Sequence, residues 1–120
     1  HFFAGFEQRY GRGAGGQAAT RRGDYLGEPI PDNTIRMFAP GFMSTGLGER
    51  DLAVNAKGNL ILSTMTHRGL STLIQIERQG GEWGAPRIAP FSIGYSDLEP
   101  MFDPRDGSLW FASKRPLPLA

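Results

Sequence analysis

Cysteine is absent from the 120-residue chain, and histidine is nearly absent. Without thiols the chain has no disulfide framework, no thiolate zinc site and no cysteine nucleophile. The two histidines, His1 and His67, do not assemble a metal-ligand cluster or a Ser-His-Asp arrangement with the rest of the sequence. We therefore predict no metal site, no cofactor and no defined set of catalytic residues.

Long apolar runs and an excess of one charge are also missing. No apolar run approaches the length of a membrane-spanning helix, so we predict no membrane span. The 13 basic and 12 acidic residues are spread along the chain and leave a net charge of +1. No basic face indicates nucleic acid as a partner.

The first 24 residues differ in composition from the remainder. Residues 11–24 are rich in Gly, Ala and Arg and show no apolar periodicity, so they cannot offset the entropy of ordering. We predict that residues 1–24 form a flexible arm and that residues 25–120 form the folded part.

From residue 25 onward, short apolar runs alternate with Gly, Pro, Asn and Asp, which is the pattern of an all-β chain. The expected strands are 35–39, 52–55, 60–64, 72–77, 87–90, 101–103 and 109–113. Hairpin turns that supply Gly are expected at 56–59, 79–82 and 104–107. The expected core consists of Leu52, Val54, Leu60, Leu62, Leu73, Ile74, Ile76, Ile88, Met101, Phe102, Leu109 and Phe111.

The sequence also predicts an internal repeat. Residues 49–55, Glu-Arg-Asp-Leu-Ala-Val-Asn, align with residues 97–103, Asp-Leu-Glu-Pro-Met-Phe-Asp, at an offset of 48. One extra residue in the second hairpin then gives an offset of 49, which aligns 58–63 with 107–112. A period of roughly 40 to 50 residues with hairpins inside each copy is typical of β-propeller blades.

Residues 97–116, DLEPMFDPRDGSLWFASKRP, resemble the TolB-type, WD-like propeller repeat. Blades of that family begin with an acidic residue and Pro, continue with an aromatic strand and a Ser-Pro-Asp-Gly turn, and end near Ser-Asn-Arg. This chain has Asp103 for the Ser, an inserted Arg105 and Lys114 for the Asn. The first copy has lost both the Pro and the Asp of the turn.

β-Propeller rings close with about four to eight blades. The resemblance implies about two four-stranded antiparallel blades in this chain, and therefore a partial β-propeller. It implies a periplasmic or secreted protein and no single activity. The chain is therefore expected to be a segment of a larger ring. Further blades, from the same or another chain, are expected beyond Ser113 and beside residues 35–39.

In a four-stranded blade, the loop that enters the first strand and the loop between the second and third strands lie on the same face. We expect charged residues to gather there as a ligand-binding face: Glu49, Arg50, Asp51, His67, Arg68, Asp97, Glu99, Lys114 and Arg115. Carboxylates beside Arg could orient a sugar or a peptide terminus. Acid and base pairs at equivalent places in successive blades also act as structural ties between loops, and we favour that interpretation.

Two functions remain open from the sequence. The favoured one is a non-enzymatic binding or scaffolding module with a protein or glycan partner. The alternative is a propeller-type hydrolase of glycans or peptides with Asp51, Asp97 and Glu99 as its acids, because two carboxylates flank the scissile bond in glycoside hydrolysis. Trp83 and Trp110 could stack on sugars, but packing between blades is the expected role of such residues.

Overall fold

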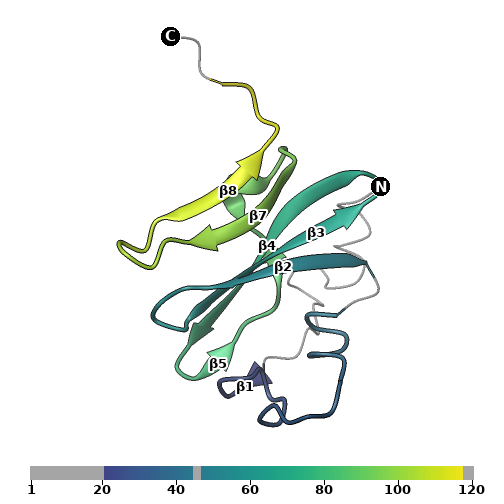
Figure 1. Ribbon diagram of the computed structural model, residues 1–120, viewed down its shortest axis with the longest axis vertical. Helices are drawn as coiled ribbons and strands as arrows, with labels where there is room; N and C mark the ends of the chain where they lie inside the picture. The colour runs from purple at the N-terminus through teal and green to yellow at the C-terminus, as the bar shows by residue number, and fades with distance from the viewer. Residues whose placement is uncertain (1–20, 45–46, 118–120) are drawn as a thin grey trace.

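The structure is a computed structural model that describes residues 21–44 and 47–117. It is all-β, as predicted: the described part contains no α-helix and one short 3-10 turn, η1 (Pro90–Ser92). The main antiparallel sheet is strongly curled, like half of a barrel, and a separate two-stranded hairpin lies beside it (Figure 1).

The strands, in chain order, are β1 (Arg21–Arg22), β2 (Gly48–Val54), β3 (Leu60–His67), β4 (Leu70–Gln79), β5 (Glu82–Trp83), β6 (Arg87–Ile88), β7 (Asp97–Phe102) and β8 (Leu109–Ser113). β2, β3 and β4 form an antiparallel meander. The 10-residue β4 also pairs with β6 near its middle and with β5 at its end, and β5 pairs with β1. β7 and β8 make the second sheet.

The three predicted hairpin turns are confirmed, and they join β2 to β3, β4 to β5 and β7 to β8. In the last of them Gly107 has a φ of 78°. Side chains resist this left-handed region, so the glycine suits the turn. A further hairpin, at residues 68–69, joins β3 to β4 in the expected loop between the second and third strands of the blade.

The predicted strand at 35–39 is wrong. These residues are irregular, and Ile35 is 100% exposed. The nearest pairing is an isolated bridge between Pro40 and Ser44. Residues with high β-propensity form a strand where they can pack against a neighbouring strand. In the described chain no strand lies beside residues 35–39.

β3 and β4 are buried on both faces, because different parts of the chain cover each side. Side chains alternate between faces along a strand. We call the side of the main sheet with Ile61 and Ile76 the rear face, and the side with Leu62 and Thr64 the front face. The β7–β8 hairpin covers the front face, where the Glu99 amide donates a hydrogen bond of 2.9 Å to Thr64 Oγ1.

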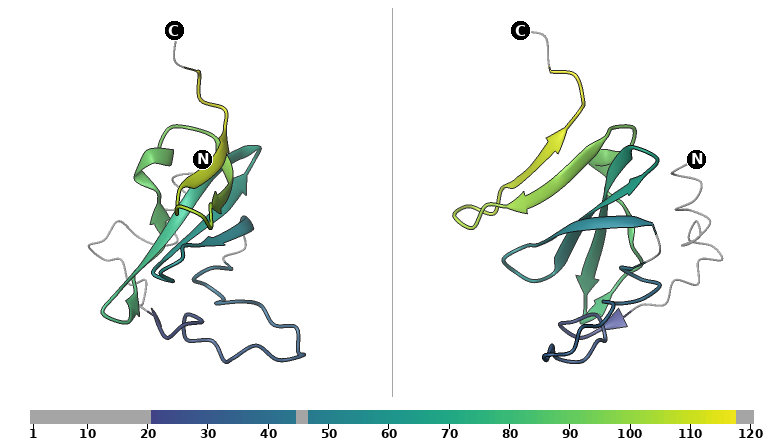
Figure 2. Two further views of the ribbon diagram at one scale, coloured as in Figure 1. Left: turned by 60° about the vertical axis from the view of Figure 1, so that its left-hand side comes forward. Right: turned by 45° about the vertical axis from the view of Figure 1, so that its right-hand side comes forward.

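Residues 21–44, the N-terminal segment, cover part of the rear face. Leu26, Ala39 and Phe42 are buried in one cluster together with Ile61, Ile76 and Trp83. Figure 2 shows the segment and the β7–β8 hairpin apart from each other, with the curled sheet between them.

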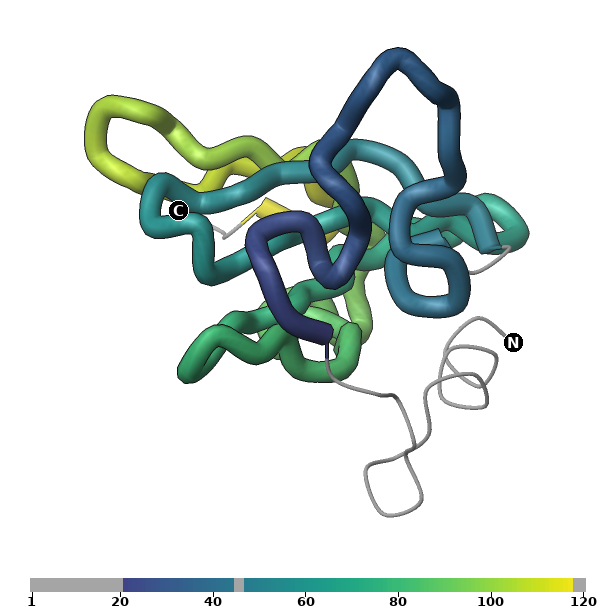
Figure 3. Tube along the Cα trace, turned by 90° about the horizontal axis from the view of Figure 1, so that it is seen from below, coloured from purple at the N-terminus to yellow at the C-terminus, as the bar shows by residue number. Residues whose placement is uncertain are grey.

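Polar contacts hold the start of this segment against β4 and β5. Trp83 Nε1 donates to the Gly23 carbonyl at 2.8 Å, and Arg78 pairs with Asp24 at 2.9 Å. Residues 21–24 of the expected flexible arm are therefore part of the fold, and residues 1–20 lie outside the described residues. Seen from below, the segment loops across the end of the sheet (Figure 3).

The predicted core is correct in β3 and β4 but not at two positions of β2 and one of β7. Leu62, Leu73, Ile74 and Ile76 are buried, and Leu60, Ile88, Phe102, Leu109 and Phe111 are half-buried. Leu52, Val54 and Met101 are instead 57%, 49% and 54% exposed. They lie on the rear face of β2 and the outer face of β7–β8, which the described chain leaves uncovered.

The two hairpins β2–β3 and β7–β8 have matching ladders. Four of the six pairs of the first ladder correspond to the four pairs of the second. Those of the first are Glu49↔Met65, Arg50↔Thr64, Ala53↔Leu62 and Val54↔Ile61; those of the second are Asp97↔Ser113, Leu98↔Ala112, Met101↔Trp110 and Phe102↔Leu109. Every residue of the second set lies 48 positions after its counterpart in the first. The offset of 49 expected after the turn does not appear, because turns 56–59 and 104–107 are equally long and differ in where their glycine stands.

Candidate functional site

The predicted charged face separates into two clusters and four individual residues. The first cluster lies where β7 crosses β2. The Arg50 guanidinium contacts Asp51 Oδ2 at 2.8 Å and Glu99 Oε1 at 3.1 Å. All three side chains are at least partly exposed. Exposed pairs of this kind contribute at most about 1 kcal/mol each.

Backbone geometry explains why the two acids reach the same arginine. Asp51 and Glu99 each have a φ of 59° and each lies at a register shift of its ladder. A bulge of this kind inserts one residue into a strand and turns its side chain away from the regular alternation. The Ser63 hydroxyl donates to the Arg50 carbonyl at 3.0 Å and helps to hold the first bulge.

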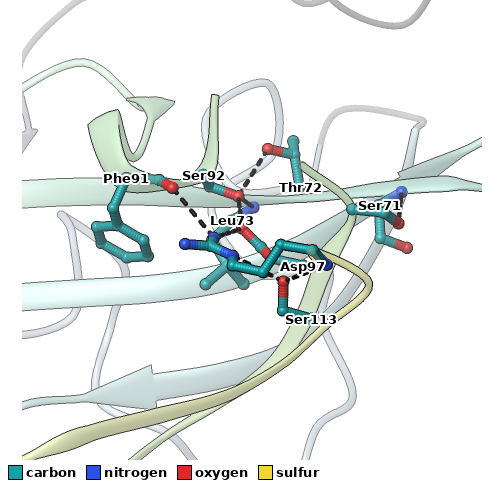
Figure 4. A network of polar contacts seen from close by, with 9 residues as sticks. Ser71, Thr72, Leu73, Phe91, Ser92, Asp97 and Ser113 are labelled. Carbon is teal, nitrogen blue, oxygen red and sulfur yellow. Dashed lines mark hydrogen bonds and ion pairs between the residues drawn. The ribbon is translucent and has the colours of Figure 1, made fainter. Parts of the chain in front are cut away.

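The second cluster is centred on Asp97, the first residue of β7. Its side chain is fully buried, and its Oδ2 accepts hydrogen bonds of 2.7 Å from both Arg115 and the Ser92 hydroxyl. Ser92 Oγ also lies 3.1 Å from Thr72 Oγ1 and accepts the Leu73 amide. Figure 4 shows Ser92, Thr72 and Asp97 directed toward one another. The network ties the η1 turn and β7 to the edge of β4.

Arg115 lies on the solvent side of this network and is partly exposed. Its guanidinium donates to the Phe91 carbonyl at 3.1 Å and lies 4.2 Å from the centre of the Tyr95 ring. Its Nε donates to the Ser113 hydroxyl at 2.8 Å. Asp97 Oδ1 is buried with no hydrogen-bond partner. The charge on Asp97 is therefore balanced by Arg115 alone among the residues in contact with it.

The other four predicted residues lie at different places along β2, β3, the turn after β3 and the end of β8. Glu49 lines a cavity of about 10 Å³ on the rear face with Phe42 and Met65. His67 ends β3, and Arg68 is exposed in the following turn. Lys114 is exposed, while its amide donates to the Ser96 carbonyl at 2.9 Å. Five of the nine residues of the predicted face thus lie in two polar clusters, one around Arg50 and one around Asp97.

Carboxyl pKa values are displaced in the β7–β8 turn. The pKa of Asp103 lies below its ordinary value because the Arg105 side chain, and then the Arg105 amide, donate hydrogen bonds to it. The pKa of Asp106 is lowered by the Ser108 amide. Both groups stabilise the turn and lie away from the two clusters.

Sequence reasoning missed Ser92 and Thr72, which connect Asp97 to β4. A serine in a linker gives no local signal for a contact with a strand about 20 residues earlier. It also missed a pocket of about 140 Å³ in the N-terminal segment, lined by Tyr25, Ile30, Met37 and Phe38 among others.

The outer face of β7–β8 is an exposed apolar surface. Met101 and Trp110 face each other across the hairpin and are 54% and 60% exposed. Trp83, by contrast, is 2% exposed. Trp83 is thus a core residue that packs with Leu26 and Phe42 of the N-terminal segment rather than between blades, whereas Trp110 is not packed within the described chain.

Within 21–44 and 47–117, no three His, Cys, Asp or Glu side chains gather where they could hold a metal ion. In this part of the chain no helix has the length and apolar character needed to cross a membrane. Comparison of the chain with family models, with curated proteins and with solved structures found no match.

Proposed function

We propose that the chain is a non-enzymatic binding or scaffolding module built from propeller-type blades. The strand order β2-β3-β4-β6 supplies a first blade of four antiparallel strands, and β7–β8 supplies the start of a second. The matching ladders, 48 residues apart, support this division. The resemblance to the TolB-type repeat adds a periplasmic or secreted location and a protein or glycan partner to the proposal.

The proposal depends on a difference in exposure between equivalent residues of the two hairpins. Met101 and Trp110 occupy the ladder positions of Ala53 and Leu62. Ala53 is 8% and Leu62 is 1% exposed, because β7–β8 lies over them. Met101 and Trp110 are 54% and 60% exposed because no described residues lie over β7–β8. Exposed apolar side chains that lie together on a surface are typical of an interaction site. We interpret the face of Met101 and Trp110 as one that packs against a further layer.

The observed contacts weigh against a hydrolase. A general acid or nucleophile must reach the substrate, but Asp97 is fully buried and bound to Arg115 and Ser92. The carboxylates of Asp51 and Glu99 are both bound to Arg50. We therefore interpret these acids as structural groups and not as catalytic groups: Glu99 ties β7 to β2, Asp51 binds its neighbour Arg50, and Asp97 ties β7 to the η1 turn.

Activity assays on the full chain test the non-enzymatic part. Chromogenic glycosides and a labelled casein substrate are incubated with the wild type, with Asp97→Asn and with Glu99→Gln. We expect no turnover above the buffer blank for any of them. Turnover by the wild type that either variant abolishes, at an unchanged melting temperature, would overturn the proposal.

A matched pair of substitutions tests the blade part. Leu62→Lys and Trp110→Lys place the same charge at equivalent ladder positions. Leu62→Lys should destroy cooperative unfolding, because an unpaired charge would be buried. Trp110→Lys should leave the melting temperature within about 2 °C, as an exposed substitution does. A large loss of stability from Trp110→Lys would mean that this face is already covered and not available for binding.

A further inference from the structure

Leu26 and Ala39 mark the two ends of a loop in the N-terminal segment. Both residues are buried, and both belong to the cluster around Trp83. The chain therefore leaves this cluster after Leu26 and returns to it at Ala39. We call the residues between them, 27–38, the outer loop. Figures 2 and 3 show this part of the chain, in dark blue, standing away from the sheet.

The backbone at the two ends of the outer loop has an uncommon conformation. Leu26 has a φ of 53° and Ala39 a φ of 45°, in the left-handed region that side chains disfavour. Arg21 ties the two ends together: its guanidinium donates to the Leu26 carbonyl at 3.0 Å and to the Pro40 carbonyl at 3.3 Å. Strain of this kind persists only where the surrounding structure holds it, and it clusters at functional sites. Compact loops with adjacent ends are also frequently functional.

A pocket of about 140 Å³ lies against the outer loop. The residues that line it fall between Tyr25 and Phe38, and the lining is mostly apolar. Its apolar walls are Tyr25, Pro29, Ile30, Pro31, Met37 and Phe38. An apolar cavity of about 150 Å³ accommodates a benzene molecule. The volume and the lining of this pocket thus suit one aromatic ring.

Two oppositely charged side chains line the same pocket. Asp32 and Arg36 are each about half exposed, and Arg36 Nη2 donates to Asp32 Oδ2 at 3.2 Å. The Thr34 amide donates to Asp32 Oδ1 at 2.8 Å and holds the turn between them. A guanidinium has several N–H donors and a carboxylate several acceptor sites, so both groups keep capacity for a ligand. Glu28 also lines the pocket, and its charge is paired with Arg21 at 3.3 Å.

We propose that this pocket binds a free aromatic α-amino acid of the phenylalanine type. The ring occupies the apolar part, Arg36 binds the α-carboxylate and Asp32 binds the α-ammonium. The neighbouring opposite charges of the protein match the two opposite charges that such a ligand carries on one carbon atom. The proposal goes beyond the binding module proposed above and does not depend on it, because the pocket lies outside both hairpins.

A set of ligands separates the three parts of this site. L-phenylalanine carries the ring and both charges, phenethylamine lacks the carboxylate, 3-phenylpropanoate lacks the ammonium, and L-alanine lacks the ring. Each is titrated into the full chain while backbone amide shifts are followed by NMR. We expect one-site, saturable binding of phenylalanine, with shifts concentrated in residues 25–38. Each single-charge analogue should bind about two to five times more weakly, and alanine about 10 to 100 times more weakly.

Two substitutions assign the charges. Asp32→Asn keeps an oxygen for the Thr34 amide but removes the negative charge, so it should weaken phenylalanine and phenethylamine about two- to fivefold without weakening 3-phenylpropanoate. Arg36→Gln should weaken phenylalanine and 3-phenylpropanoate by a similar factor without weakening phenethylamine. Ile35→Ala, at a fully exposed residue outside the pocket lining, is the matched control and should bind all the ligands as the wild type does. Circular dichroism checks that each variant folds.

A wild type without saturable phenylalanine binding would overturn the proposal. So would alanine binding as tight as that of phenylalanine, or amide shifts spread evenly over the sheet. Equal losses of both single-charge analogues in each variant would show that Asp32 and Arg36 only shape the loop, and would reject their assignment. None of these results touches the non-enzymatic module, whose tests are the turnover and Leu62/Trp110 experiments. The two proposals can therefore be rejected separately.

Discussion

Asp51 and Glu99 adopt the same left-handed backbone conformation, each with a φ of 59°, and their carboxylates bind one guanidinium, that of Arg50. The two residues lie at matching register shifts of the β2–β3 and β7–β8 ladders. Residues other than glycine adopt this conformation uncommonly. The same backbone irregularity in the two hairpins thus lets both carboxylates reach one guanidinium.

Substitutions at Glu99 should separate backbone conformation from charge. Glu99→Val is expected to lower the free energy of unfolding by about 1 to 2 kcal/mol, because a β-branched side chain resists the left-handed region. Glu99→Asn should remain within about 0.5 kcal/mol of the wild type, since Asn tolerates that region and an exposed ion pair contributes little. Urea denaturation measures both. Equal stabilities for the two variants would argue against strain at the bulge.

Arg115→Leu should be among the most damaging changes at a side chain that is not fully buried. Removing Arg115 leaves the fully buried Asp97 carboxylate without its counter-charge, which costs about 3 kcal/mol or more. Lys114→Leu, one position earlier and exposed, is the control and should change stability by less than about 0.5 kcal/mol. Chemical denaturation of the two variants side by side gives the comparison. Similar losses would mean that the Asp97 network contributes little.

Acid should weaken the β7–β8 turn through Asp103. Its pKa is lowered from the ordinary 3.8, chiefly by the Arg105 side chain. A carboxyl with a lowered pKa in the fold stabilises the fold above its ordinary pKa, and this contribution is lost as the pH falls through the lower folded value. Carbon-detected NMR titration should find the Asp103 pKa below 3.8. In Asp103→Asn the pH dependence of stability below pH about 4 should be smaller than in the wild type. An Asp103 pKa at or above its ordinary value would contradict the Arg105 contact.

Shortening single side chains in the N-terminal segment tests whether residues 21–44 belong to the folded unit. Leu26 is 1% exposed and packs in the Trp83 cluster, so Leu26→Ala should cost about 2 to 5 kcal/mol. Ile35→Ala removes an apolar side chain from the same segment at a site that is 100% exposed, and it should change stability by less than about 0.5 kcal/mol. Thermal and urea unfolding measure both. A neutral Leu26→Ala would place the start of the fold after this segment.

Gly107→Val should destabilise the β7–β8 hairpin by about 1 to 3 kcal/mol. A Cβ atom at this position would meet no atom within 4 Å, so the expected cost comes from the left-handed φ of 78°. Gly107→Asn has the same space available and should cost less, because Asn populates this conformation more readily than Val. Hydrogen exchange at β7 and β8 amides would localise the effect. A neutral Gly107→Val would mean that the turn adopts another conformation.

The all-β class and the three hairpins with glycine turns could be predicted from sequence, because turn chemistry acts over a few residues. The residues of the candidate face could also be named, but not their pairing. Arg50 meets Glu99 only because β7 crosses β2, and Asp97 meets Ser92 only because the η1 turn lies against β4. Neither contact has a local signal.

The sequence by itself determined where the chain turns and which residues are apolar enough for a core. Only the tertiary structure decided which of those residues are buried. Val54 and Leu62 are both core-type residues of one hairpin, yet Val54 is 49% and Leu62 is 1% exposed. Turn formation depends on local backbone preference, whereas burial depends on whether another layer lies over a given face of the sheet, and that layer comes from distant sequence or from another molecule.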